Sequence, residues 1–149
     1  MEDLVRWLGE QLDEDERIAR AVRVPHEWHQ GPGDDPEWTD EELVCMWPPE
    51  FHTPYEQEKH WRGLTVDGPE LAAYIAAHDP ARVLREIDAK RRIMECHEPW
   101  TASNGDTICG RCGREHIDGR PGGHFPCQTL RLLALPYADR PGYRAEWRP

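Results

Sequence analysis

Apolar residues recur at helical spacing in the first 22 residues of the chain. Leu4, Leu8 and Leu12 are four positions apart, and Ala19 and Val22 continue the same face. A stripe with this period is typical of a helix that buries one side and exposes the other. The pattern therefore predicts an amphipathic helix at the N-terminal end.

The helical period stops there, and residues 24–68 follow a different pattern. Short runs with β-forming residues occupy 43–47 and 63–66, and loops rich in Pro, Gly and acidic residues separate them. Runs of this length bounded by turn residues are typical of strands. We expect two or three short antiparallel strands with long connections.

A third region, starting at Pro69, returns to the helical pattern. Pro in the first turn favours a helix start, and Leu71, Tyr74, Ile75 and His78 would form one face of this helix. The sequence therefore predicts a helix with these four residues on a common side.

A second central helix is predicted directly after the first. Asp79 is a suitable N-cap and Pro80 a suitable first residue, and Pro99 prevents the helix from continuing much beyond His97. Its predicted buried stripe consists of Val83, Leu84, Ile87 and Met94. Cys96, near its end, is expected to be a small core residue.

The last predicted helix begins at Pro126–Cys127 and ends before Pro136. Residues 129–135 are apolar almost all round, so this helix should be largely buried. The tail that follows, 136–149, is rich in aromatic residues and Arg. We expect it to pack back onto the protein, with partner binding as the alternative.

These elements predict an α+β fold that is mainly helical. We expect an N-terminal helix, a small irregular antiparallel sheet, two central helices, and a C-terminal zinc knuckle followed by a buried helix. The predicted domains are a helical domain of residues 1–96 with a loop-rich β insert at 24–68, and a zinc-stapled module of residues 97–149 that carries the tail.

Charge is distributed unevenly along the 149 residues. Residues 1–68 contain 6 Lys and Arg against 18 Asp and Glu, whereas residues 109–149 contain 7 Arg against 4 acids, in a chain of net charge −11. An acidic N-terminal half repels phosphate backbones, so binding of nucleic acid by the whole chain is disfavoured.

The composition also argues against a membrane or secreted protein. No run approaches the roughly 20 apolar residues that a bilayer span needs. The acidic start, Met1 to Leu4, is unlike a signal peptide. Five cysteines is an odd number and three of them fit a metal site, so a reducing cytoplasm is expected.

Candidate chemistry is concentrated at Cys109 and Cys112, which are separated by two residues and followed by Gly113. A tight turn aims both sulfurs at one point, and a glycine after it lets the backbone fold beneath them. With Cys127, this spacing predicts a structural zinc site. A redox pair would instead need a long helix starting at Cys109, which Gly113 would break; free thiols are the remaining alternative.

The residues alone leave the fourth ligand open. Cys96, His97, His116 and His124 all compete for this position. His97 would tie the end of the long helix to the knuckle, whereas His124 would pair with Cys127 across a short loop.

The chain resembles a family of small uncharacterised actinobacterial and actinophage proteins, the family of unknown function DUF6221. The resemblance rests on residues 4–8, 78–84, 90–93 and 126–139. It covers roughly residues 1–22 and 78–149. It implies His97, Cys109, Cys112 and Cys127 as the ligands of a structural Zn²⁺ and disfavours His124. It implies no activity.

No catalytic motif is evident, so we expect a non-enzymatic adaptor that binds another protein. The first alternative is an acidic, phage-type antagonist that occupies the positive groove of a DNA-binding host protein through residues 1–68. The second is a degenerate HNH-like, metal-dependent nuclease, suggested by residues 112–123 but lacking a second cysteine pair. The sequence does not indicate an oligomeric state.

Overall fold

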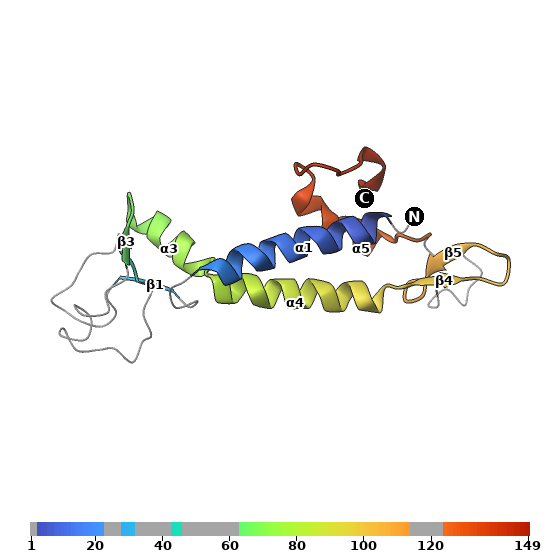
Figure 1. Ribbon diagram of the computed structural model, residues 1–149, viewed down its shortest axis with the longest axis horizontal. Coiled ribbons are helices and arrows are strands. Elements are labelled where there is room, and N and C mark those ends of the chain that lie inside the picture. The colour runs from blue at the N-terminus through green and yellow to red at the C-terminus, as the bar shows by residue number, and fades with distance from the viewer. Residues whose placement is uncertain (1–2, 23–27, 32–42, 46–62, 114–123) are drawn as a thin grey trace. The chain divides into compact units, whose positions relative to one another are not determined.

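The computed structural model describes residues 3–22, 28–31, 43–45, 63–113 and 124–149 (Figure 1). Helices predominate in these ranges, and short antiparallel strands accompany them, which confirms the predicted α+β fold. No helix in these ranges is long and apolar enough to span a membrane. His116 and most of the predicted insert lie outside the described residues.

The chain divides into two compact units. One unit comprises Met1–Asp15 and Ile87–Pro149, and the other comprises Glu16–Glu86. The boundaries fall inside helices α1 (Asp3–Ala21) and α4 (Pro80–Cys96). The sequence-based division at residue 97 stays a prediction.

The unit Glu16–Glu86 contains the three-stranded sheet expected from the sequence. Strands β1 (His29–Gln30), β2 (Leu43–Cys45) and β3 (Gly63–Thr65) pair antiparallel in that order. Helix α3 (Pro69–Ala77) packs on this sheet. The small core consists of Val44, Ala72 and Ala76, with Trp28, Val66 and Ile75 packed against it.

Of the four residues on the predicted face of α3, Ile75 packs against the core and the other three are exposed. Leu71 and Tyr74 are 43% and 62% exposed, whereas Ala72 and Ala76 are buried against Val44. The helix is apolar on several sides, so periodicity could not select its inner face. Two small residues four positions apart let the helix backbone approach the sheet closely, which larger side chains would prevent.

Asp79 joins α4 to the rest of this unit. Its Oδ1 accepts a hydrogen bond from the backbone N–H of Arg82 at 2.6 Å, which is the predicted N-cap contact. Its Oδ2 accepts a second bond from the backbone N–H of Trp28 at 3.3 Å. Asp79 is 8% exposed, so both carboxylate oxygens make these hydrogen bonds where little water reaches them.

We expect Asp79→Ala to lower the free energy of unfolding by about 1–2 kcal/mol, because it removes a cap and leaves a second amide without its acceptor. Asp79→Asn is the matched variant: it keeps Oδ1 as an acceptor and should recover part of the loss. Urea unfolding followed by far-UV circular dichroism measures both. An Asp79→Ala protein as stable as the parent would contradict this role.

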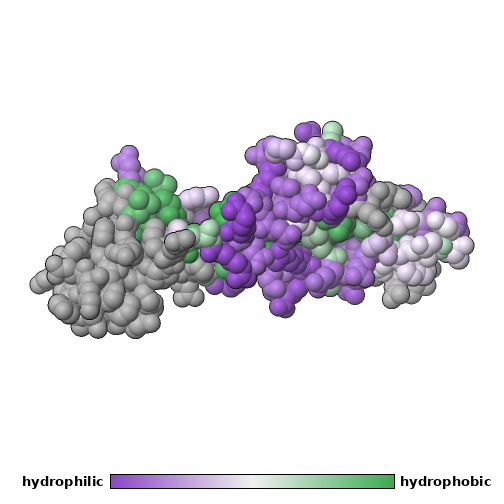
Figure 2. Space-filling model, viewed as in Figure 1, coloured by the Kyte–Doolittle hydropathy of each residue, from purple (hydrophilic) through white to green (hydrophobic). Residues whose placement is uncertain are grey.

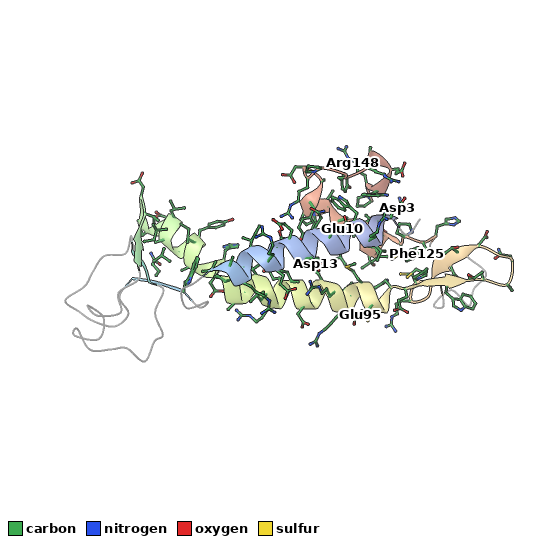
Figure 3. All side chains as sticks on the ribbon, viewed as in Figure 1. Asp3, Glu10, Asp13, Glu95, Phe125 and Arg148 are labelled. Atoms are coloured by element: carbon green, nitrogen blue, oxygen red, sulfur yellow. The ribbon has the colours of Figure 1, made fainter. Side chains whose placement is uncertain are left out.

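In the unit that contains both chain termini, α1 supplies much of the core. Leu4, Trp7, Leu8 and Leu12 are all buried, as their spacing predicted. An ion pair of 2.6 Å between Asp13 of α1 and Arg91 of α4 joins the two helices. Figure 3 shows Asp13 on the side of α1 that faces α4.

The C-terminal tail packs against α1. The rings of Tyr143 and Trp147 contact that of Trp7, with centroids 5.6 and 5.4 Å away. The indole N–H of Trp7 donates to the carbonyl of Pro141 at 3.0 Å. A Cβ at Gly142, which has φ +87°, would lie 2.9 Å from that nitrogen, so the close approach requires glycine.

Helix α5 (Gln128–Ala134) is less buried than the sequence predicted. Leu130 and Ala134 are fully buried, but Leu132 is 51% exposed, and Leu135 just beyond the helix is 44% exposed. The helix buries one stripe only, because its opposite side has no neighbour within the described residues that covers Leu132.

Candidate metal centre

The end of α4 leads into a β-hairpin that forms one wall of the site. Strands β4 (Pro99–Thr101) and β5 (Thr107–Cys109) pair antiparallel, with Trp100 opposite Ile108. The turn between them is closed by the N–H of Ala102, which donates to the carbonyl of Asp106 at 2.8 Å. The sequence analysis did not predict these two strands.

Cys109 ends β5, and the chain then turns sharply through Cys112. The N–H of Gly113 donates to the carbonyl of Cys109 at 2.7 Å, and the N–H of Cys112 points at the Cys109 Sγ at 3.5 Å. A Cβ at residue 113 would lie 2.8 Å from that carbonyl oxygen and 2.6 Å from Ile108 Cδ1. Gly113 is therefore required for the turn, as the sequence predicted.

Cys127 reaches the same place from the opposite side of the hairpin. His124 forms an isolated antiparallel bridge with Ile108 of β5, and the N–H of Phe125 donates to the carbonyl of Thr107 at 3.2 Å. The buried Phe125, labelled in Figure 3, anchors this segment. Cys127 follows as the residue before α5, and its side chain is 3% exposed.

His97 directs its ring at the three sulfurs. Its Nδ1 lies 3.4 Å from the Sγ of Cys109, 3.5 Å from that of Cys112 and 3.4 Å from that of Cys127. The four candidate ligand atoms all lie within 4.8 Å of one another. The structure thus brings together the four residues that the sequence predicted, and they are able to bind a metal ion.

These distances have the dimensions of a tetrahedral zinc site. Zn–S bonds of about 2.3 Å and Zn–N bonds of about 2.0–2.1 Å place nitrogen and sulfur at the corners of a tetrahedron about 3.5 Å apart. The three distances from His97 Nδ1, 3.4 to 3.5 Å, agree with this value. The near equality of the three distances also indicates a common centre.

Without a bound cation, the cluster disfavours the negatively charged thiolate form of Cys112. Burial, a hydrogen bond to Cys109 and the charges of Cys127 and Cys109 raise the pKa of Cys112 to about 12. Three thiolates packed together repel one another, and a bound dication reverses this effect by stabilising the thiolate form. Metal binding at neutral pH should therefore release the Cys112 proton.

The competing fourth ligands have different places. His124 is exposed and is not part of the cluster. Cys96 is exposed rather than in the core, so that prediction is wrong; as the last residue of α4 it precedes His97, and the two side chains leave the helix in different directions. The turn at residues 110–113 is not the start of a helix, which argues against the alternative of a redox motif in which a long helix starts at Cys109.

A family model for the family of unknown function DUF6221 matches residues 1–149. The chain belongs to this family. The match includes residues 24–77, for which the sequence had suggested no counterpart in DUF6221. No curated protein and no solved structure matches the chain. Membership of DUF6221 carries no activity, and the actinobacterial or phage origin stays a prediction.

Proposed function

We propose that His97, Cys109, Cys112 and Cys127 hold one structural zinc ion in this protein. The agreement of the three Nδ1–Sγ distances with tetrahedral zinc carries the proposal. Three thiolates and one imidazole form a soft donor set, which suits zinc rather than magnesium or calcium. Four protein ligands fill the tetrahedron and leave no open position for a substrate, so the role is structural rather than catalytic.

Such an ion would tie together three elements that are separated in sequence. His97 follows α4, Cys109 and Cys112 belong to the hairpin and its turn, and Cys127 precedes α5. The hairpin is short and its Trp100 is 46% exposed, so it buries little apolar surface of its own. Metal binding supplies folding free energy where a core is too small to do so.

We further propose that the protein is a non-enzymatic adaptor that binds another protein. This role is supported by the exposed apolar side of α3, where Leu71 and Tyr74 are 43% and 62% exposed. Figure 2 shows hydrophobic surface gathered at α3 and mainly hydrophilic surface over the paired helices. Exposed apolar side chains gathered on one surface are typical of a protein-binding site.

Paired variants on two exposed surfaces test the adaptor role. Leu71→Glu with Tyr74→Glu changes the outward side of α3, whereas Leu132→Glu changes an equally exposed leucine of the other unit. A partner captured from host lysate and identified by mass spectrometry should bind the Leu132→Glu protein and lose affinity for the α3 variant. If the partner still bound the α3 variant, this face of α3 would be excluded as the binding surface. A nucleic-acid-binding protein as the partner would favour the antagonist alternative.

A further inference from the structure

The three sulfurs of the metal cluster differ in their exposure to solvent. The side chain of Cys109 is fully buried and that of Cys127 is 3% exposed, whereas Cys112 is half-buried. A small oxidant from solvent therefore reaches Cys112 before the other two. Exposure of a thiolate next to a second thiolate is the arrangement that redox-sensing cysteines share.

Cys112 also has a resolving partner on the same turn. The Sγ atoms of Cys109 and Cys112 belong to the group that lies within 4.8 Å of one another, and the Cys112 N–H points at the Cys109 sulfur. A disulfide requires the sulfurs to approach to about 2.0 Å. The two residues are separated by only two others, so this ring has the smallest closure cost of the possible pairs.

Cys127 is less suited to be that partner. It lies on another segment, directly before α5, and its carbonyl accepts the N–H of Arg131 at 3.1 Å in the first turn of that helix. Its Sγ belongs to the same group of atoms within 4.8 Å, but a disulfide between Cys112 and Cys127 would close a much longer loop than one between Cys112 and Cys109. The structure therefore favours Cys109 over Cys127 in a reaction that follows oxidation of Cys112.

We propose that Cys109 and Cys112 form a redox switch, in which hydrogen peroxide oxidises the pair to a disulfide and the metal ion leaves. This inference rests on the proposed zinc site. The Cys112 thiolate attacks the peroxide O–O bond, forming a sulfenic acid and, with one proton, water. The Cys109 thiolate then attacks the sulfenic sulfur, forming the S–S bond and, with a second proton, a second water.

The net reaction consumes two thiolates, one peroxide and two protons, and yields one disulfide and two waters. The sulfurs are oxidised and the peroxide oxygens are reduced, so no other oxidant is needed. His97 and Cys127 are the two ligands left, and two ligands do not hold zinc as four do. Oxidation would thus remove the metal link between the hairpin, the end of α4 and the start of α5.

The experiment treats zinc-loaded full-length protein with hydrogen peroxide. A chelating dye follows zinc release, and alkylation, proteolysis and mass spectrometry map the disulfides, including any that involve Cys45. We expect one zinc released for each Cys109–Cys112 disulfide formed, and recovery of zinc binding after a thiol reductant and zinc are added. Cys96→Ser is the matched control, because it removes an exposed thiol outside the cluster; its rate of zinc release should be unchanged.

The other outcomes separate this inference from the proposed function. A chain that carries no zinc and does not bind added zinc overturns both. A chain that holds zinc and keeps it while Cys96 is oxidised overturns the switch alone. Zinc release accompanied by a disulfide to Cys127 or Cys96, in place of Cys109–Cys112, also overturns the switch and leaves the zinc site intact.

Discussion

Cys127→Ser is expected to abolish stoichiometric zinc binding and to unfold much of the unit that contains both termini. Structural zinc in small modules binds with apparent free energies of about 10–16 kcal/mol, which is comparable to the whole stability of a domain, about 5–15 kcal/mol. A serine hydroxyl is a poor substitute for a thiolate ligand. Cys127 also stands immediately before α5, so loss of its bond to metal frees the start of that helix.

Cys96→Ser provides the matched control for this prediction. Cys96 is exposed and lies next to His97 in sequence, yet it is outside the cluster. Its substitution should leave zinc content at about one equivalent per chain and change stability by no more than about 0.5 kcal/mol. The parent protein treated with a strong chelator should behave like Cys127→Ser.

Two measurements compare Cys127→Ser with Cys96→Ser. Elemental analysis gives zinc per chain, and near-UV circular dichroism reports on the packing of Trp7 with Trp147, which lie in the same unit as the cluster. If Cys127→Ser kept one equivalent of zinc and the parent tryptophan signal, the proposed ligand set would be wrong.

The metal cluster was largely predictable because its signals are local. Cys109, Cys112 and Gly113 lie within five residues, and the turn that they require is fixed by sterics that do not depend on the rest of the fold. Asp79 and its following proline are a similar case, because an N-cap is a contact between residues three apart. His97 followed from the family resemblance rather than from spacing.

The features that the sequence missed depend on distant contacts. Leu71 and Tyr74 have the right spacing for a buried face, but alanines on the neighbouring face pack better against the sheet. The strands of the hairpin are only three residues long, too short for an alternating pattern to be recognised. Cys96 is apolar by type, but it lies two positions after Met94 and therefore on another side of the helix from the apolar stripe.

The packing of the tail on α1 is a further long-range feature. Arg140 pairs with Asp15 at 2.6 Å and lies over the ring of Tyr137, with 4.7 Å to the centroid. The Tyr137 hydroxyl accepts a hydrogen bond from Lys90 at 3.1 Å. Nothing in the sequence near Arg140 identifies an acid 125 positions away, so the composition of the tail could predict that it packs but not where.

The second prediction with a large effect concerns which histidine, His97 or His124, is the fourth zinc ligand. His97→Ala should lower zinc affinity by more than about 100-fold, because changes even outside the ligand shell cost about 10–100-fold and this one removes a ligand. The end of α4 would then lose its link to the hairpin.

His124→Ala is the matched variant, since His124 is exposed and its bridge to Ile108 uses backbone atoms only. Its zinc release should match that of the parent protein, with a change in stability of at most about 0.5 kcal/mol. A colorimetric chelator in excess measures the release rates of both variants side by side. Faster release from His124→Ala than from His97→Ala would reverse the assignment, because the three Nδ1–Sγ distances of about 3.5 Å would then reflect packing rather than a shared ion.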